Sequence, residues 1–276
     1  MSTILITGAT DGLGRALASR LAADGHRLII HGRSLDRLNA AADEIASDGA
    51  ARPEIVVADL AELAQVRRLA DEVGERTDRL DVFVSNAGIG SGEPDGRERR
   101  TSADGYELRF AVNYLAGFLL TCELLPFLQA SAPARIINVA SLGQHPLDFD
   151  DLMLERGYDG TRAYAQSKLA QIMSGFELAD RLPAGEVTVN SLHPSTYMPT
   201  KMVLQEIGHH VDSLEDGVAA TYRLVTDPAL ADTTGRFFDR TREARAADQA
   251  YDGAARAALW QRSLELVERD DPLDPG

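Results

Sequence analysis

The composition of the chain narrows the classes of protein to which it can belong. It has 276 residues, of which 44% are hydrophobic, 26% charged and 6% aromatic, a balance typical of a soluble globular protein with one or at most two domains. Asp and Glu number 43 against 28 Lys and Arg, and this excess of negative charge argues against nucleic acid as a partner. The single cysteine, Cys122, excludes an internal disulfide and a cysteine-based zinc site. We expect it to be buried, in a protein of the reducing cytoplasm.

The order of apolar runs along the chain predicts an α/β fold. The first residues, MSTILITG, lack the basic region and cleavage site of a signal peptide and instead indicate a strand that runs into a glycine turn. Short β-rich runs then alternate with amphipathic stretches rich in Ala and Leu. This pattern predicts one domain over residues 1–276, a doubly wound, Rossmann-type parallel sheet of about seven strands with helices on both faces. The expected strands are 3–7, 27–31, 54–58, 80–85, 134–140, 187–192 and 235–238, and the expected helices are 12–24, 34–48, 61–76, 104–129, 161–182, 199–209, 214–227 and 247–268.

Three other segments have distinctive compositions. The apolar tract 110–130 has about the length of a membrane span, but we expect a core or interface helix because it contains residues that a bilayer disfavours, namely Asn113, Glu123, Pro126 and Gln129. Residues 88–103 are rich in glycine and charge and predict a solvated loop. Residues 142–160 mix carboxylates with apolar side chains and predict a packed excursion over a site.

The glycine turn after the first strand predicts a dinucleotide site. It is followed at once by the helical stretch RALASRLAADG, so backbone N–H groups at a helix N-terminus are open to a pyrophosphate. The candidate cofactor residues of this turn are Gly8, Thr10, Asp11, Gly12, Leu13 and Gly14.

The spacing of the turn is TGxxxGxG, and two later segments follow the third and fourth strands in a related way. They are Asp59-Leu60 and the run Ser85-Asn86-Ala87-Gly88. Together these motifs resemble the short-chain dehydrogenase/reductase family, and the resemblance covers nearly the whole chain. It implies that Asp59 and Leu60 lie beside an adenine and that Asn86, Ala87 and Gly88 also belong to the cofactor site.

The end of the second strand indicates which nicotinamide nucleotide is bound. A carboxylate there would accept hydrogen bonds from a ribose 2′-hydroxyl and repel a 2′-phosphate, but the residues are Ile29-Ile30-His31-Gly32-Arg33-Ser34. The planar guanidinium of Arg33 can bind a phosphate, so we favour NADP(H) over NAD(H). Asp11 departs from the basic residue that some NADP-dependent relatives have in the glycine turn.

Tyr164 and Lys168 stand four residues apart in a stretch of helical periodicity, so both side chains project from one helix face. Tyrosine is a poor acid or base near neutral pH, and we expect the ammonium of Lys168 to lower the pKa of Tyr164. Lys168 is one of only two lysines, with Lys201, in a chain that otherwise uses arginine. The pair therefore predicts acid/base chemistry.

The resemblance completes a catalytic set of Asn113, Ser141, Tyr164 and Lys168. It implies that Ser141, at the end of the fifth strand, hydrogen-bonds the substrate oxygen, and that Asn113 holds a helix kink and a water that relays protons to Lys168. Tyr164 follows Ser141 by 23 positions, and this segment includes an insertion similar to that of the retinol dehydrogenase and oxidoreductase-like branch.

After the sixth strand, the run Asn190-Ser191-Leu192-His193-Pro194 resembles a cofactor-binding segment of the family. It implies that Pro194 and Thr196 lie at the nicotinamide. The usual spacing to a following threonine is not kept, because Thr200 lies one place late. The remaining histidines have no metal-ligating spacing, and no metal is expected.

These features predict an NADPH-dependent oxidoreductase that interconverts a ketone or aldehyde with an alcohol on a hydrophobic small molecule, with tyrosine as general acid/base. A redox-neutral enzyme of the same fold, such as an epimerase or dehydratase, and a nucleotide-sensing protein without chemistry remain alternatives. The resemblance implies a homodimer or homotetramer assembled through residues near 104–129 and 161–182. The abundance of Arg and Ala with scarce Lys suggests a bacterial source.

Overall fold

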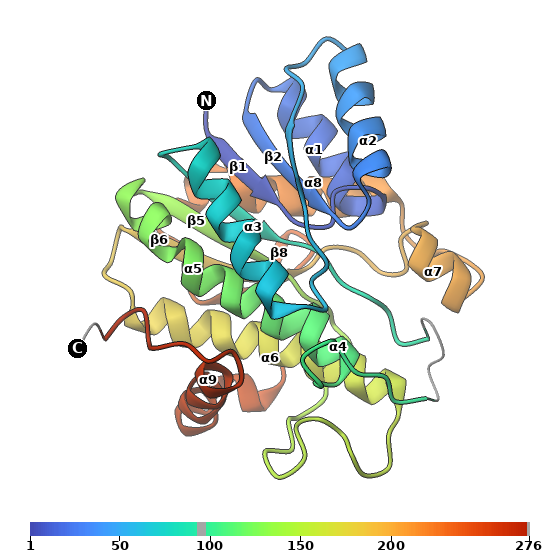
Figure 1. Ribbon diagram of the computed structural model, residues 1–276, viewed down its shortest axis with the longest axis vertical. Helices are drawn as coiled ribbons and strands as arrows, with labels where there is room; N and C mark the ends of the chain where they lie inside the picture. Colours follow the sequence, from blue (N-terminus) through green and yellow to red (C-terminus); the bar gives the residue numbers. More distant parts are fainter. Residues whose placement is uncertain (93–97, 275–276) are drawn as a thin grey trace.

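One sheet forms the centre of the molecule (Figure 1). The computed structural model describes residues 1–92 and 98–274. The strands follow the order β3-β2-β1-β4-β5-β6-β7-β8, and neighbours pair in parallel except for the antiparallel pair β7 and β8. Their bounds are β1 (Thr3–Ile6), β2 (Arg27–Gly32), β3 (Glu54–Val57), β4 (Val82–Ser85), β5 (Ala134–Val139), β6 (Val187–His193), β7 (Arg236–Asp239) and β8 (Arg242–Ala244).

Helices cover both faces of this sheet. They are α1 (Gly12–Ala23), α2 (Leu35–Ser47), α3 (Leu63–Arg76), α4 (Leu108–Phe110), α5 (Ala116–Ala130), α6 (Gly160–Arg181), α7 (Lys201–Glu206), α8 (Leu214–Thr226) and α9 (Gly253–Leu266). A π-helical turn, η1 (Ala111–Leu115), joins α4 to α5, and η2 (Pro228–Leu230) and η3 (Asp248–Tyr251) are 3₁₀ turns.

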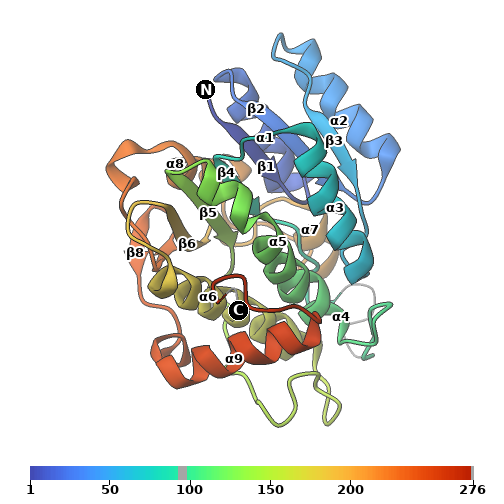
Figure 2. The same cartoon turned by 60° about the vertical axis from the view of Figure 1, so that its left-hand side comes forward.

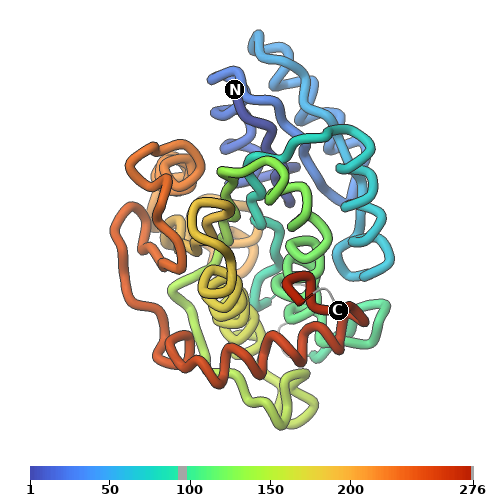
Figure 3. Tube along the Cα trace, turned by 90° about the vertical axis from the view of Figure 1, so that its left-hand side faces the viewer, coloured from blue at the N-terminus to red at the C-terminus, as the bar shows by residue number. Residues whose placement is uncertain are grey.

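Two hydrophobic cores hold the layers together. On one face α1, α2 and α8 pack on the sheet, for example through Leu17, Leu38 and Leu224. On the other face α3, α5 and α6 contribute side chains such as Val66 and Ile172, and α9 lies outside them against α6 (Figures 2 and 3). Because both faces are covered, the central strands are continuous apolar runs rather than alternating ones. The predicted doubly wound α/β fold is confirmed.

The structure differs from the predicted elements in several places. An eighth strand, β8, pairs with β7 at the edge of the sheet. The helix expected from residue 104 begins only at Leu108, because Gly105 has a φ of +85° and Glu107 caps α4 by accepting from the Phe110 N–H. The helix expected over 199–209 is confined to α7, which ends before Gly208 at φ +80°. The stretch 247–268 is divided into η3 and α9. Residues 93–97 of the expected loop 88–103 lie outside the described residues.

The segment 142–160 is packed, but not over the cleft described below. Leu147 and Leu152 are buried in the core on the α6 side of the sheet. Gln249 of η3 holds Leu147 through both its backbone N–H and its carbonyl oxygen. The expectation that this excursion covers a site is therefore wrong for its apolar part, and only Leu142 and Gly143 at its start line the cleft.

The apolar helix is a core helix in this fold. Within the described residues, Leu108–Ala130 is the one helical segment long and apolar enough to cross a membrane, and 67% of its most apolar window is buried inside the protein. Cys122 on this helix is buried, and burial raises the pKa of its thiol to about 12.

The two helical regions expected at a subunit interface are partly covered by the chain's own C-terminal segment. Trp260 of α9 stacks edge-on against Phe118 of α5. Arg269 donates a hydrogen bond to the Cys122 carbonyl oxygen, and α9 packs along α6. The homo-oligomer stays a prediction, and less of these two helices is free to form it.

Candidate active site

The predicted cofactor and catalytic residues meet at one cleft where the strands end. Strand order reverses between β1 and β4, and ligands of open α/β sheets bind in the crevice that such a reversal opens. The cleft has a volume of about 990 Å³. The predicted residues along it are Gly8, Thr10, Asp11, Gly12, Leu13, Gly14, Arg33, Asp59, Leu60, Asn86, Ala87, Gly88, Ser141, Tyr164, Lys168, Pro194 and Thr196.

The glycine turn forms a cradle that has no room for side chains. Gly8 and Gly12 have φ of +69° and +52°, which other residues rarely adopt. A Cβ on Gly14 would lie 2.4 Å from the Gly8 carbonyl oxygen. Asp11 caps α1 by accepting from the Gly12 N–H at 2.8 Å. The open backbone and the positive end of the α1 dipole fit a pyrophosphate.

Hydrogen bonds join this turn to the loop after β4. The Thr7 hydroxyl accepts from the backbone N–H groups of Asn86 and Ala87 at 3.0 and 3.1 Å. The Asn86 amide in turn donates to the carbonyl oxygens of Thr7 and Gly8 at 2.8 and 3.2 Å. Asn86 therefore contributes to the cofactor site by holding the backbone of the glycine turn in place.

Arginines dominate the cleft where β2 ends. Arg33 is exposed there and lines the cleft. Asp11, the residue that departs from a basic turn, forms an ion pair with Arg37 at 3.0 Å, and Arg37 lines the cleft too. The negative charge of Asp11 is thus offset by a neighbouring guanidinium.

His31 belongs to this region although the sequence did not point to it. It is 1% exposed. Its Nε2 lies 3.0 Å from the Ala58 carbonyl oxygen, so it donates there, and its Nδ1 accepts from the Gly8 N–H at 3.4 Å. Burial lowers the pKa of His31 to about 4. The imidazole is therefore neutral and holds the backbone of the glycine turn through the Gly8 N–H.

Asp59 and Leu60 follow β3 at the same end of the cleft. The Asp59 carboxylate accepts from the Ala61 N–H at 3.0 Å, and its own backbone N–H donates to Gln65 at 2.8 Å. Leu60 is buried. These contacts hold the polar side chain of Asp59 beside the apolar side chain of Leu60. An adenine base, which has a flat apolar face and a polar edge, can contact both.

Ser141, Tyr164 and Lys168 come together across β5 and α6. The Tyr164 and Ser141 side chains lie close enough for Ser141 to lower the pKa of Tyr164, and Ser141 Oγ accepts from the Gly143 N–H at 3.0 Å. Lys168 Nζ lies 5.9 Å from the centre of the Tyr164 ring and donates to the Val139 carbonyl oxygen at 2.8 Å. Spacing of four residues on one helix gives this arrangement.

The acid/base properties of the pair differ from the expectation. Burial raises the pKa of Tyr164, and its hydrogen bond with Ser141 opposes that rise. Burial lowers the pKa of Lys168 to about 8. The expectation that Lys168 lowers the pKa of Tyr164 does not hold in this structure, because desolvation of the phenolate dominates.

Asn113 lies behind the cleft, in the π-helical turn. Its Oδ1 accepts from the Ile89 N–H at 2.8 Å, and its Nδ2 donates to the Ile89 carbonyl oxygen at 3.1 Å and to Ser167 Oγ at 3.0 Å. Both amide protons are therefore used. The side chain pins the loop after β4 to α6, and the proposed water relay stays a prediction.

The loop after β6 is held by a carboxylate outside the predicted set. Asp212 accepts from the Thr196 N–H at 2.8 Å and from Ser195 Oγ at 3.0 Å, and it pairs with Arg240. These donors hold the pKa of Asp212 at about 2. Thr200, one place late in the motif, caps α7 by accepting from the Val203 N–H and lies against Gly12.

Apolar side chains of the loop after β6 and of α7 also line the cleft: Tyr197, Met198, Met202, Val203 and Ile207. Glu206 stands among them and accepts from the Ser91 backbone N–H and hydroxyl at 3.0 and 2.8 Å, while the side-chain-free Gly90 makes room for it. Glycines spaced two apart at 88, 90 and 92 were the only sequence signal of this contact.

Comparison with known proteins decides the family. The model of the short chain dehydrogenase family matches residues 2–209. The chain belongs to this family. It is thus an NAD(P)-dependent oxidoreductase that interconverts carbonyl and alcohol groups, and the predicted retinol dehydrogenase-like branch is confirmed by its relatives. Human retinol dehydrogenase 13 is 35% identical over 98% of this chain and 86% of its own length. A candidate daunorubicin C-13 ketoreductase of Streptomyces sp. strain C5 is 35% identical over 96% of this chain and 92% of its own.

Solved structures of other proteins have the same fold. A crystal structure of a protein from Mycobacterium paratuberculosis superposes with a TM-score of 0.77 at 28% identity, covering 98% of this chain and 95% of the other. The Pseudomonas aeruginosa RhlG/NADP active-site complex superposes with a TM-score of 0.70 at 27% identity, covering 86% of this chain and 94% of the other. Over residues 1–92 and 98–274 of this dehydrogenase, no cluster of three or more His, Cys, Asp or Glu side chains could hold a metal.

Proposed function

We propose that this dehydrogenase uses NADPH to reduce a ketone or aldehyde group on an apolar small molecule, and catalyses the reverse oxidation. One observation carries the proposal: Ser141 and Tyr164, whose side chains lie close enough for Ser141 to lower the pKa of Tyr164, line the same cleft as the glycine turn and the apolar side chains after Pro194.

The side chains divide the chemistry of reduction among them. Bound NADPH supplies the hydride. Tyr164 keeps its proton at neutral pH, because its pKa is raised, and donates that proton to the carbonyl oxygen. Ser141 donates to the same oxygen and so stabilises the negative charge that develops there. Lys168 Nζ, anchored on the Val139 carbonyl oxygen, has donors left to hold the nicotinamide ribose.

The preference for NADPH rests on charge at the end of β2. Arg33 lies exposed at the cleft, and Arg37 next to it offsets Asp11. None of residues 29–34, at the end of β2, is a carboxylate that could receive a ribose 2′-hydroxyl. A 2′-phosphate is therefore attracted at this end of the cleft rather than repelled.

The apolar side chains along the cleft suit an apolar substrate. Met202, Val203 and Ile207 line the cleft, and methionine side chains adapt to ligands of irregular shape. The names of two relatives, retinol dehydrogenase 13 and a candidate daunorubicin C-13 ketoreductase, support alcohol and ketone chemistry.

Initial rates of NADPH and NADH oxidation against apolar aldehydes, ketones and quinones test the proposal. We expect turnover with NADPH, loss of about 100-fold or more in Tyr164→Phe with unchanged NADPH binding, and loss of the NADPH preference in Arg33→Ala. Arg52→Ala is the matched control, since Arg52 pairs with Asp43 outside the cleft. Equal rates in Tyr164→Phe would refute the mechanism. Tight nucleotide binding with no turnover would favour the redox-neutral or sensing alternatives.

A further inference from the structure

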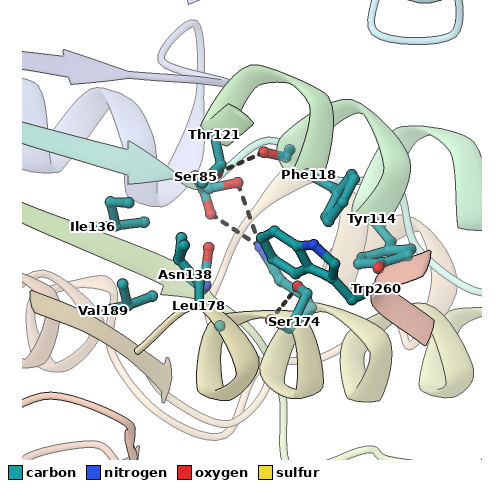
Figure 4. Close-up of a pocket in the computed structure, with 13 residues that line it drawn as sticks. Ser85, Tyr114, Phe118, Thr121, Ile136, Asn138, Ser174, Leu178, Val189 and Trp260 are labelled. Carbon is teal, nitrogen blue, oxygen red and sulfur yellow. Dashed lines mark hydrogen bonds between the residues drawn. The ribbon is translucent and has the colours of Figure 1, made fainter. Parts of the chain in front are cut away.

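A small second cavity lies between the sheet and helices α5 and α6 (Figure 4). Its volume is about 20 Å³, which is enough for one water molecule. Ser85, Asn138 and Ser174 present polar groups to it, and Phe118 and Trp260 close its apolar end.

Gln171 connects this cavity with the large cleft. It follows Lys168 by three residues on α6 and is 4% exposed. Its Oε1 accepts a hydrogen bond from Lys168 Nζ at 3.5 Å, and its Nε2 donates to the carbonyl oxygen and the Oγ of Ser85 at 3.4 Å. Lys168 lines the cleft, whereas Gln171 and Ser85 line the small cavity. The mechanism described above does not use this buried amide.

The contact bears on the charge of Lys168, because the groups that the described residues place against that amine are neutral. Lys168 is 5% exposed, and burial alone accounts for its lowered pKa of about 8. Tyr164 faces it from its own helix, and β5 presents the Val139 carbonyl oxygen. Gly88, after β4, lies beside it. Each neutral acceptor on Nζ favours the ammonium form over the amine.

Helix α7 presents the carboxylate of Glu206 to the cleft. It raises the pKa of Tyr164, whereas burial is the cause of the shift at Lys168. In the described part of the chain, Lys168 Nζ donates to the Val139 carbonyl oxygen and to the Gln171 amide oxygen.

We propose that Gln171 is a positioning residue for Lys168: it holds Nζ from the cavity side and favours its charged form, while Ser85 and one water molecule in the cavity fix the amide. Its effect on turnover rests on the proposed function. Its effect on the proton affinity of Lys168 does not, and can be measured without substrate.

The small number of lysines makes that measurement direct. Protein labelled with ¹³C at lysine Cε contains two labelled side chains, Lys168 and Lys201, and Lys201→Arg assigns the signals. We expect Lys168 in the cofactor-free protein to titrate near pH 8. Gln171→Leu removes an acceptor and should lower the midpoint by about half a pH unit or more, whereas Gln171→Glu adds a negative charge and should raise it.

Two further variants separate the contact from general effects of the cavity. Ser85→Ala removes the hydroxyl that holds the Gln171 amide and should lower the midpoint less than Gln171→Leu does. Thr121→Val is the control, because it also lines the cavity but its hydroxyl donates to the Gly117 carbonyl oxygen and not to Gln171. It should titrate as the unmodified protein does.

The pH profile of kcat supplies the second readout. With NADPH and a turned-over carbonyl substrate, the alkaline limb should move to lower pH in Gln171→Leu and to higher pH in Gln171→Glu. A purely structural role would lower the rates without opposite shifts. Midpoints that stay unchanged, or that move in the same direction in both variants, would overturn the proposal. If Gln171→Leu does not fold, as judged by its melting curve, Gln171→Glu and Ser85→Ala still decide. Opposite NMR shifts in a protein that turns over no substrate would reject the proposed function and retain the positioning role.

Discussion

His31 should make the stability of this protein fall as the pH is lowered from about 6.5 toward 4. The imidazole is buried at 1% exposure, and its pKa is lowered from 6.5 to about 4. Below pH 6.5 the unfolded chain binds a proton at His31 while the folded chain does not. Acid therefore favours the unfolded state until the folded imidazole also becomes protonated.

The size of the effect follows from the shift in pKa. Each unit corresponds to about 1.4 kcal/mol, so the full difference is about 3 kcal/mol and about 2 kcal/mol is already lost at pH 5. A charged imidazole can no longer accept the Gly8 N–H through Nδ1. Protonation should thus also loosen the glycine turn and weaken nucleotide binding.

Urea unfolding followed by circular dichroism at pH 7 and pH 5 tests this in the unmodified protein and in His31→Gln. Glutamine does not titrate but can keep a donor toward the Ala58 carbonyl oxygen. The stability difference between the two proteins should shrink by about 2 kcal/mol at pH 5, and the many carboxylates common to both cancel. A difference that is the same at both pH values would refute the buried, neutral imidazole.

Three other variants or reagents probe separate parts of the structure. Gly14→Ala should weaken NADPH binding by about tenfold to 100-fold in calorimetry, because its Cβ would lie 2.4 Å from the Gly8 carbonyl oxygen. Gly253→Ala, at the start of α9, would place its Cβ at an ordinary 3.9 Å from Arg256 and should leave NADPH binding unchanged. Equal affinities of the two variants would contradict the cradle. Arg109→Met should lower the free energy of unfolding in urea by about 3 kcal/mol or more. Glu107, which forms an ion pair with Arg109 at 3.7 Å, is also 1% exposed and would keep a buried charge without its ion-pair partner. A decrease below about 1 kcal/mol would speak against that ion pair. Cys122 should react with a thiol reagent only after unfolding, since burial raises its pKa to about 12, and rapid labelling of the native protein would show that the site opens.

The order of elements was readable because its signals are local. Apolar runs and glycines mark the strands and turns within a few residues, and Tyr164 and Lys168 share a helix face by spacing alone. Arg33 and Ser141 could be placed at strand ends for the same reason, since the carboxyl ends of parallel strands meet at one edge. The bounds of α4 and α7 were less readable, because single caps and positive-φ glycines set them.

Contacts between distant segments could not be read in this way. His31 under the glycine turn, Asp212 behind Thr196, and Glu206 against Ser91 each join residues far apart in sequence. The apolar residues of 142–160 looked like a cover for the cleft, yet Gln249 and the core draw them away from it. Hydrophobic composition shows that such a segment is buried but not which surface buries it.

The sequence by itself determined the doubly wound fold and the residues that meet at the carboxyl edge of the sheet, because those follow from periodicity and from the direction of parallel strands. Only the tertiary structure decided the proton affinities of Tyr164, Lys168 and His31. A pKa depends on how much water and how many charges surround a group, and those neighbours come from every layer of the fold.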